Sequence, residues 1–526
     1  MGEILLPRPP LFLYYLQSIS FSMSSDLILA IDAGTTGCRA VAFSGDGERV
    51  ASAYREFPGS YPRPNWVEQD ATEWWKAICE STRGVMKELG NNTDIAAVAV
   101  TNQRETVVPV AEDGKPLRGA LVWQDRRSTK ECEFIESELG ADRIYDVTGL
   151  VIDPYFTLPK LVWLQLNEPE VFSAASKFLL VHDYVVFKLT GRCVTEHSNA
   201  SRTMLFDLKS REWSPEILAR FEISEEKLPE LLPPGTLVGE IAKEASEQTG
   251  LPEGTGIYTG GGDQQCAALG CGVVKSGRVS ATTGTGTFCL AFSAVPLWDA
   301  PQRRLLCSAH ALPGTYVVEA SIFTTGAAYR WLRNNFAQDL LGAAETDPYD
   351  VLNEEAKTSA AGARGVTFIP HLAGAGAPHW NPSAVGVLHG LSVGHTRGDI
   401  VRAMMEGTSV EIKKNLEVMK AMKIPITELC ITGGGARSKL WAQIQADMCG
   451  IPVLRSPTED ATALGAAILA AVGAKIHKNI ETAVESMVKP GTKLEPDKDK
   501  FEIYQQVYER SIKLYNQITS KGEESP

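Results

Sequence analysis

The stretch LILAIDAGTTGCRAVAF at residues 27–43 decides the fold class. An apolar run at 27–32 ends in Asp32, a short Gly/Thr turn follows, and a second apolar run covers 38–44. Short apolar runs separated by turn residues predict neighbouring strands. The following segment, RVASAYREF (49–57), continues the pattern, so the start of the chain is predicted to be an antiparallel meander.

The turn in this stretch, DAGTTG (32–37), has the residue types of a phosphate-binding loop. Its glycines let the backbone turn tightly, while Thr35 and Thr36 offer hydroxyl and N–H groups to phosphate oxygens. An aspartate at a strand end, here Asp32, can hold Mg²⁺, and Arg39 on the next strand can meet a phosphate. An ordinary hairpin turn remains the alternative interpretation.

The second half of the chain repeats this arrangement in GRVSATTGTGTFCLAFSAVP (277–296), again strand, Gly/Thr turn and strand. The repeat predicts two lobes of related topology with a nucleotide between them. A third glycine-rich turn, ITGGGARSKLW (431–441), connects a predicted strand to a helix and suits a phosphate or adenosine. It is neither G-x-G-x-x-G nor a Walker A sequence, which disfavours a nicotinamide dinucleotide and a P-loop.

The length of 526 residues allows two large lobes. We expect a first lobe at 26–272, a second at 273–515 and a flexible tail at 516–526. Residues 1–25 are expected to be an extension, either a leader or the product of a start codon upstream of Met23. The predicted fold class is α/β.

Composition excludes several classes of function. The net charge is −13, and no basic face is indicated, so we expect no nucleic-acid partner. No segment has the long charge-free apolar run of a membrane helix, so we expect no membrane insertion. The ten cysteines form no CxxC pair, which favours reduced thiols in a cytoplasmic protein. The eight histidines have no metal-site spacing.

Polar residues at predicted strand ends are the candidates for chemistry. TNQRET (101–106) places Arg104 beside Glu105, a pair that can exchange hydrogen bonds with the hydroxyls of a polyol. GGGDQQ (260–265) places Asp263 after flexible backbone, where it could be the general base for an alcohol. Trp123 and Phe288 could cover the apolar face of the same ligand. A surface ion pair, core aromatics and a solvated loop aspartate remain the alternatives.

Apolar spacing also predicts the main helices. A helix is expected at 71–89, helical structure through 158–190, and a small-residue helix that packs closely on its neighbours at 461–474. The segment 95–103 reads as a buried strand.

Longer strings in the chain resemble the FGGY family of carbohydrate kinases, and within it the glycerol kinase branch most. The resemblance runs from Leu27 to about Val472. The strings that carry it are YPRPNWVEQD (61–70), TNQRET (101–106), TGLVIDPYF (148–156), NASRTMLFD (199–207), GDQQ (262–265) and TALGAA (462–467). YFTLPKLVWL (155–164) and GVLHGLSVGHTRGDIVRAMMEG (386–407) fit the two family signatures.

The resemblance implies a two-lobed, actin/hexokinase-like ATPase fold, each lobe having a ribonuclease-H-like mixed sheet with flanking helices. It also implies transfer of the γ-phosphoryl group of ATP to glycerol, with Mg²⁺. Asp263 matches the family's general base, and Asp32 matches the residue on the side of the site where the metal ion binds. The positions that match the glycerol contacts are Arg104, Glu105, Trp123, Tyr155, Asp263, Gln264 and Phe288. Those that match the nucleotide contacts are Thr35, Thr36, Arg39, Thr285, Gly326, Gly434 and Ser438.

Departures from the glycerol branch lie mainly on the nucleotide side. Ala33 and Gly37 replace the usual Gln and Ser of the first turn, Ser438 replaces an Asn, and Arg330 replaces an adenine-side Gln. Gly256 stands where the bacterial loop that binds fructose 1,6-bisphosphate has an Arg, so that regulation is not expected.

Two rival functions follow. One is an FGGY kinase for another polyol or a ketopentose such as xylulose. The other is a non-catalytic ATP switch of the actin/chaperone superfamily. A homo-oligomer, dimer or tetramer, is expected by analogy with the family.

Overall fold

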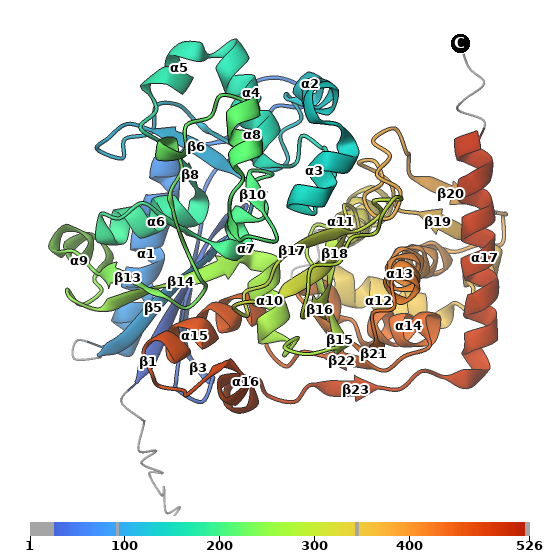
Figure 1. The fold of residues 1–526 in the computed structure, drawn as a ribbon. Coiled ribbons are helices and arrows are strands. Elements are labelled where there is room, and N and C mark those ends of the chain that lie inside the picture. Colours follow the sequence, from blue (N-terminus) through green and yellow to red (C-terminus); the bar gives the residue numbers. More distant parts are fainter. Residues whose placement is uncertain (1–25, 91–93, 342–346, 521–526) are drawn as a thin grey trace, which may run out of the picture.

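The computed structural model describes residues 26–90, 94–341 and 347–520. It has two lobes, each built on a mixed β-sheet with flanking helices (Figure 1). The predicted extension at 1–25 lies outside the described residues, as do residues 521–526 of the predicted tail. Residues 516–520, also predicted as tail, are instead the last part of helix α17 (Lys498–Ser520).

The first lobe is built on a six-stranded sheet. Its strands are β1 (Leu27–Ala33), β2 (Gly37–Phe43), β3 (Arg49–Glu56), β5 (Ile95–Asn102), β13 (Leu237–Glu240) and β14 (Gly256–Gly262). The spatial order is β13-β14-β5-β1-β2-β3. The pairs β1–β2 and β2–β3 are antiparallel, which confirms the predicted meander. Because β1, β5 and β14 are parallel, their polar carboxyl ends meet at one edge of the sheet.

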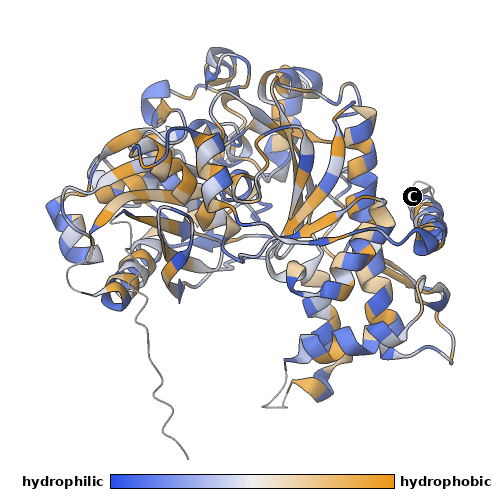
Figure 2. Ribbon diagram, turned by 90° about the horizontal axis from the view of Figure 1, so that it is seen from below, coloured by the Kyte–Doolittle hydropathy of each residue, from blue (hydrophilic) through white to orange (hydrophobic). Residues whose placement is uncertain are grey.

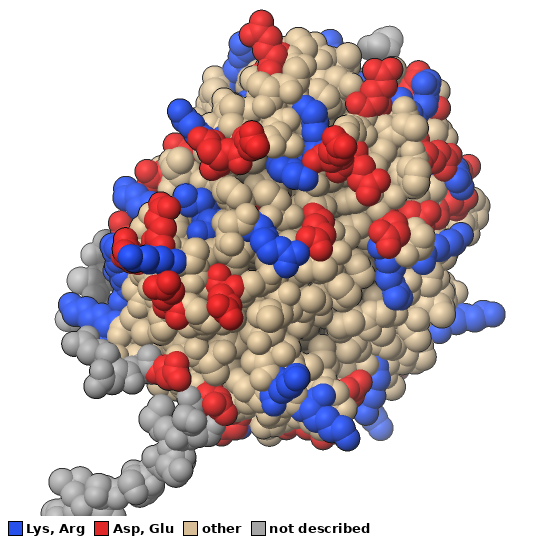
Figure 3. Space-filling view, turned by 60° about the vertical axis from the view of Figure 1, so that its left-hand side comes forward, with Lys and Arg blue, Asp and Glu red and all other residues tan. Residues whose placement is uncertain are grey.

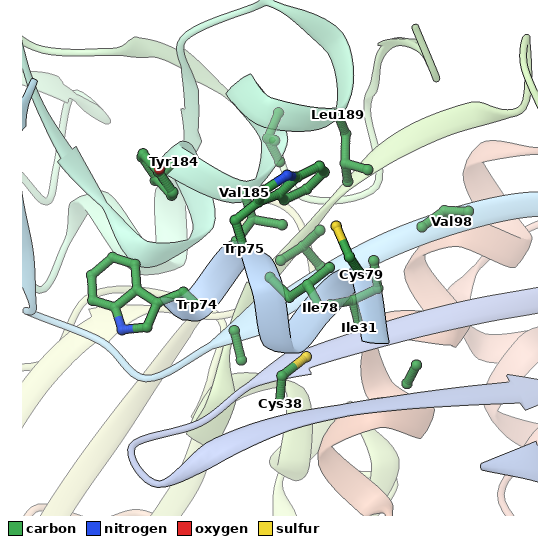
Figure 4. Close-up of a cluster of buried hydrophobic side chains, with 14 of the residues drawn as sticks. Ile31, Cys38, Trp74, Trp75, Ile78, Cys79, Val98, Tyr184, Val185 and Leu189 are labelled. Atoms are coloured by element: carbon green, nitrogen blue, oxygen red, sulfur yellow. The ribbon is translucent and has the colours of Figure 1, made fainter. Parts of the chain in front are cut away.

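Helices α1 (Ala71–Leu89) and α6 (Val181–Thr190) lie over one face of this sheet. Figure 4 shows Trp74 and Ile78 of α1 above Ile31 and Cys38 of the strands, with Tyr184 of α6 packed nearby. The side chain of Asp70 accepts a hydrogen bond from the backbone N–H of Thr72, so it caps α1 where the predicted helix begins.

The opposite face is covered by α10 (Asp263–Gly270) and α15 (Ala461–Gly473). A Cβ on Gly465 would lie 1.9 Å from the carbonyl oxygen of Cys266, so only glycine allows this approach of the two helices. The predicted close packing of the 461–474 helix is therefore confirmed. Although α15 comes late in the chain, it packs on the first lobe, and α16 (Ile480–Met487) lies beside it (Figure 1).

The outer part of the first lobe is a layer of helices around a four-stranded sheet with the order β4-β7-β6-β8. The helices are α2 (Thr129–Leu139), α3 (Ala141–Thr148), α4 (Thr157–Asn167), α5 (Pro169–Ala174) and α8 (Pro215–Arg220). The strands are β4 (Glu68–Gln69), β6 (Val107–Val110), β7 (Ala120–Leu121) and β8 (Lys177–Leu180).

Strand β8 contradicts the prediction that 158–190 is helical throughout. It pairs antiparallel with β6, with Phe178 opposite Pro109. The run from Phe178 to Leu180 is buried on consecutive positions, and a short, fully buried apolar run has no periodicity that distinguishes strand from helix.

Smaller elements complete this lobe: β9 (Val194–Glu196) pairs with β12 (Glu230–Leu232), and β10 (Phe206–Asp207) pairs with β11 (Glu212–Trp213). Two further helices are α7 (His197–Ala200) and α9 (Lys243–Thr249).

The second lobe is built on a seven-stranded sheet with the order β17-β18-β16-β15-β21-β22-β23. The strands are β15 (Gly277–Thr283), β16 (Thr287–Ser293), β17 (Leu306–Ala309), β18 (Tyr316–Ile322), β21 (Ile426–Thr432), β22 (Val453–Arg455) and β23 (Thr492–Leu494). From β18 to β23 the sheet repeats the strand directions of the first sheet from β3 to β13. This agrees with the related topology that the repeated turns predicted.

The helices of this lobe are α11 (Gly326–Phe336), α12 (Pro348–Thr358), α13 (Arg397–Ala421), α14 (Lys439–Cys449) and α17, next to the hairpin of β19 (Thr367–Ile369) and β20 (Val387–His389). In Figure 2 the strands of both lobes are mostly hydrophobic, and the helices show hydrophilic faces toward the outside.

The surface carries mixed charge. Acidic and basic side chains alternate on the face drawn in Figure 3, and neither sign forms a continuous patch there. None of the helices in the described part of the chain is long and apolar enough to cross a membrane. All ten cysteines are free, and most are buried.

Candidate active site

Three neighbouring cavities lie around the glycine-rich turns of the two lobes. The inner cavity, of about 170 Å³, is lined by Thr35, Arg104, Glu105, Trp123, Tyr155, Asp263, Gln264, Thr282, Gly284, Thr285, Gly286 and Phe288. All seven positions that match glycerol contacts are therefore in one cavity. The glycine-rich turn at 284–286 contributes one wall, so the second lobe closes a site whose polar groups come mostly from the first.

Arg104 and Glu105 lie just beyond β5, after Gln103, at the carboxyl edge of the first sheet. Glu105 has a backbone φ of 63°, a left-handed conformation that is uncommon for residues other than glycine and concentrates at functional sites. Across from it, a Cβ on Gly262 would lie 2.6 Å from Cδ of Arg104. The third glycine of GGGDQQ therefore makes room for the arginine side chain.

The guanidinium group of Arg104 is almost completely engaged. Its Nη1 and Nη2 atoms donate to the two carboxylate oxygens of Glu319 at 2.7 and 3.1 Å, and Nη1 also donates to Gln265. Its Nε lies 3.2 Å from Oδ1 of Asp263. Of the five N–H groups of a guanidinium, this leaves one on Nη2 without a partner among the described residues.

Glu105 is held by a second buried arginine. Nε of Arg202 donates to Oε1 of Glu105 at 2.6 Å, and Nη2 of Arg202 lies 3.4 Å from Glu319. Oε2 of Glu105 has no hydrogen bond among the described residues. Two arginines and two glutamates thus form a buried, charge-balanced array beside the inner cavity, in which one N–H of Arg104 and Oε2 of Glu105 keep no partner among the described residues, a pattern that suits neighbouring hydroxyl groups.

Asp263 is the first residue of α10, and its side chain is 28 % exposed within the enclosed cavity. Burial raises the pKa of Asp263 to about 6, while Arg104 lowers it and Glu105 raises it. One of its oxygens, Oδ1, accepts the backbone N–H of Gln264 at 2.7 Å. A carboxylate with a pKa near neutrality, facing a cavity of hydroxyl-binding groups, can accept a proton from an alcohol.

The first Gly/Thr turn faces two cavities. Thr35 lies in the inner cavity, where its hydroxyl oxygen accepts the indole N–H of Trp123 at 3.0 Å, and its carbonyl accepts from Gln69. Thr36 instead lines the turn cavity, about 400 Å³ in volume. Its lining is Asp32, Gly34, Thr36, Gly37, Arg39, Tyr54, Gly433, Gly434, Arg437, Glu459, Asp460 and Thr462.

Of the three carboxylates that line the turn cavity, Asp460 and Glu459 form ion pairs with arginines, and Asp32 has no ion pair among the described residues. Burial raises the pKa of Asp32 to about 7, Asp263 and Asp460 raise it too, and Arg39 opposes them. Asp460 accepts from Arg39 at 2.7 Å and from Arg49 at 3.1 Å. No cluster of three or more His, Cys, Asp or Glu side chains that could hold a metal ion occurs among the described residues.

The outer cavity, about 300 Å³ in volume, lies mainly in the second lobe. Its lining is Thr283, Gly284, Thr285, Gly326, Tyr329, Arg330, Asp347, Tyr349, Asp350, Asn353, Gly434, Gly435, Arg437, Ser438 and Trp441. Gly284 and Thr285 also line the inner cavity, and Gly434 and Arg437 the turn cavity. The outer cavity therefore adjoins both other cavities at the two glycine-rich turns of the second lobe.

Ser438 caps the start of α14, where its hydroxyl oxygen accepts the backbone N–H of Trp441 at 3.2 Å. Its hydroxyl is 3.0 Å from Oδ1 of Asn353, which the hydroxyl of Tyr329 also approaches at 3.1 Å. With its oxygen held by two hydroxyl groups, the amide of Asn353 keeps its NH₂ group for other contacts of the outer cavity.

The sequence matches known proteins over both lobes. Residues 27–270 match the N-terminal domain of the FGGY family of carbohydrate kinases, and 279–474 match its C-terminal domain. The chain belongs to the FGGY family of carbohydrate kinases.

Several curated members of the family are similar over most of their length. The chain is 40 % identical to a glycerol kinase of Gloeobacter violaceus over 464 residues, which cover 85 % of this chain and 88 % of the relative. It is 38 % identical to a glycerol kinase of Bordetella parapertussis over 481 residues, covering 87 % and 91 %. The resemblance inferred from the sequence is therefore confirmed.

Solved structures of FGGY kinases share the fold. A xylulose kinase of Rhodospirillum rubrum superposes with a TM-score of 0.84 at 28 % identity, covering 94 % of this chain and 99 % of that one. A glycerol kinase of Plasmodium falciparum with ADP gives 0.82 at 25 % identity, covering 93 % and 98 %. The predicted two-lobed α/β kinase fold is confirmed.

Within this FGGY kinase, the structure brings all the predicted site residues to the three cavities. Four further residues contact the predicted site residues or line the cavities, and they were not identified from the sequence: Arg202, Glu319, Asn353 and Asp460. Arg202 lies inside the string NASRTMLFD, so that string was a usable signal. Glu319, Asn353 and Asp460 occur in segments without a motif, and only the fold brings Glu319 to Arg104 and places Asn353 and Asp460 at the cavities.

Proposed function

We propose that this FGGY kinase is a glycerol kinase, which transfers the γ-phosphoryl group of ATP to glycerol and forms sn-glycerol 3-phosphate. The observation that carries the proposal is the inner cavity. Arg104, Glu105 and Asp263 line it together with Trp123 and Phe288, and Nε of Arg104 lies 3.2 Å from Oδ1 of Asp263. The names of the similar curated proteins support the same substrate.

In the proposed reaction, Arg104 and Glu105 hold neighbouring hydroxyls of glycerol, and the aromatic rings cover its C–H face. Asp263 accepts the proton of the attacking hydroxyl as the phosphoryl group moves in line from ATP. The turns that contain Thr36 and Thr285 hold the phosphates. Most of the acceleration comes from positioning and electrostatics, because phosphoryl transfer requires little covalent chemistry from the protein.

Mg²⁺ bound with ATP would offset the charge of the phosphates, and Asp32 is the residue that would hold it. Adenosine would occupy the outer cavity, between Arg330, Asn353 and Ser438. Closure of the lobes would exclude water and limit hydrolysis of ATP.

The alternative acceptor is a ketopentose such as xylulose. Two solved xylulose kinases share the fold at 27 and 28 % identity, against 25 % for the solved glycerol kinase. The test is ADP release by the purified protein with Mg-ATP and, in separate reactions, glycerol, xylulose, erythritol and ribulose. The proposal expects turnover with glycerol well above the other three. Turnover restricted to another acceptor would reject glycerol as substrate. Binding of ATP without release of ADP by any acceptor would instead indicate a non-catalytic switch.

Three further expectations stay proposals. By family analogy the protein is a homo-oligomer, a dimer or tetramer, which light scattering after size exclusion measures. The free cysteines favour a cytoplasmic location. The lobe boundary is proposed near residues 271–278, between α10 and β15.

A further inference from the structure

Lys160, on the first turn of α4, is a fully buried cation that no step of the proposed reaction uses. Its Nζ donates to the carbonyl oxygens of three consecutive residues, Pro154 at 2.8 Å, Tyr155 at 2.6 Å and Phe156 at 2.9 Å. An ammonium group has three N–H donors and no acceptor. All of its hydrogen-bonding capacity is therefore directed at one short segment of backbone.

This segment carries a wall of the inner cavity. The ring of Tyr155 lines the cavity and meets the ring of Trp123 edge to face, with centroids 5.6 Å apart. Its backbone N–H donates to Asp153 at 2.8 Å, and the hydroxyl of Thr157 donates to the carbonyl of Glu105 at 3.1 Å. The backbone N–H of Phe156 also donates to the carbonyl of Asp153 at 3.2 Å, and the three carbonyls bound by the lysine add to these contacts that fix the path of the chain through Tyr155.

Burial of the Lys160 ammonium group costs free energy, which suggests that the lysine has a positioning role. Burial lowers the pKa of Lys160 to about 7, while Glu105, Asp125 and Asp153 raise it and Arg126 lowers it. No carboxylate within the described residues forms an ion pair with it. A buried ammonium group whose hydrogen bonds all go to carbonyl oxygens carries a desolvation penalty that an apolar side chain of similar length would avoid.

We propose that Lys160 is a positioning residue for polyol binding: by clamping the carbonyls of residues 154–156 it holds the ring of Tyr155 against the inner cavity. The proposal deepens the proposed function, since it assigns a role in acceptor binding to a residue that does not contact the acceptor. It also gives a physical reason for a lysine in the middle of the segment YFTLPKLVWL.

The chain contains a matched control. Nζ of Lys227 also donates to three carbonyls, those of Phe172 at 2.8 Å, Ser173 at 3.0 Å and Ala175 at 2.8 Å. These carbonyls belong to the end of α5, and Lys227 lines none of the three cavities. Both Lys160→Met and Lys227→Met therefore remove a lysine that binds three carbonyls. The first does so beside the inner cavity and the second away from it.

The test is the KM for glycerol and the KM for ATP of the full-length variants, measured beside the wild type. Misplacement of a binding group by about 1 Å can lower the rate about 100-fold. We expect Lys160→Met to lower kcat/KM for glycerol about 10- to 100-fold through KM, with the KM for ATP within about twofold of wild type. Lys227→Met should leave both constants within about twofold. An unchanged KM for glycerol in folded Lys160→Met overturns the proposal.

A double-mutant cycle tests whether Lys160 acts through Tyr155. In a Tyr155→Ala background, Lys160→Met should cause less than about a further twofold loss, because the positioned ring is already absent. A further loss as large as in the wild type contradicts the proposal. If Lys160→Met does not fold by circular dichroism, Lys160→Gln, which keeps a shorter donor, replaces it. If neither variant folds, Lys160 is a folding residue and the proposal is wrong.

The outcome is separable from that of the proposed function. If the wild type acts only on another polyol, glycerol is rejected as substrate. The same comparison of variants is then made with the polyol that is turned over.

Discussion

Glu319 offers the sharpest test of how the second lobe shapes the acceptor site. It lies on β18 of the second sheet, is wholly buried, and holds both Nη atoms of Arg104. Arg202 adds a third guanidinium contact at 3.4 Å. The perturbation is Glu319→Gln, which keeps the shape of the side chain but turns an NH₂ group toward a guanidinium and leaves one buried positive charge without its partner.

The magnitude follows from this geometry. Removal of one partner from a buried ion pair costs about 3–5 kcal/mol, and the isosteric amide retains one acceptor, so we take the lower end, about 3 kcal/mol. If the loss is expressed at Arg104, kcat/KM for glycerol falls about 100-fold, since about 1.4 kcal/mol corresponds to a factor of ten. The KM for ATP should change little, because Glu319 lines none of the nucleotide-side cavities.

The assay is ADP release at varied glycerol and saturating Mg-ATP. Glu216→Gln is the control, because Glu216 forms an exposed pair with Arg143, and exposed pairs contribute about 0–1 kcal/mol. Glu319→Gln with a glycerol kcat/KM within about twofold of wild type would refute the reasoning, since Arg104 would then be positioned without the second lobe.

Three other predictions concern the acceptor, the nucleotide and the proton. Gly262→Ala places a Cβ 2.6 Å from Cδ of Arg104 and should lower kcat/KM for glycerol about 10- to 100-fold. Asn353→Asp removes an amide donor of the outer cavity and should raise the KM for ATP about three- to tenfold, with the KM for glycerol unchanged. Because a general base must be deprotonated, and burial raises the pKa of Asp263 from 3.8 to about 6, kcat/KM should fall as the pH drops below about 6.

Each of these predictions has a control or a contrary outcome. Gly239→Ala is the control for Gly262, because its Cβ would meet Thr190 at an ordinary 3.6 Å. If Asn353→Asp raises the KM for glycerol, Asn353 acts on the acceptor site and its assignment to the nucleotide site is wrong. Glu105→Gln removes a like charge beside Asp263 and should move the acidic limb of the pH profile to lower pH. If kcat/KM of the wild type falls only near pH 4, the assignment of Asp263 as a general base with a raised pKa is wrong.

Local patterns in the sequence were sufficient for the repeated strand–turn–strand units and for helix α1. They were also sufficient to place Arg104, Glu105 and Asp263 at strand ends, because parallel strands bring their carboxyl ends to one edge. They were insufficient for β8, whose consecutive buried positions have no period. Thr35 and Thr36 were predicted to offer groups to phosphate oxygens, and this stays a prediction: Thr35 lines the inner cavity and Thr36 the turn cavity.

The residues that reasoning from motifs missed depend on long-range contacts. Glu319 meets Arg104 across 215 positions of sequence, and Asp460 meets Arg39 across 421. A lone carboxylate in a strand or loop has no local pattern, and its role follows only from which cation the fold brings to it.

The most direct test of the central claim compares the wild type with Asp263→Asn at saturating glycerol and Mg-ATP. The account predicts that the amide, which cannot accept the proton, lowers kcat about 10²- to 10⁴-fold. It also predicts that the KM for ATP stays within about threefold, since the outer cavity is untouched. An Asp263→Asn protein that phosphorylates glycerol at a rate within about tenfold of wild type would contradict the claim that Asp263 is the general base.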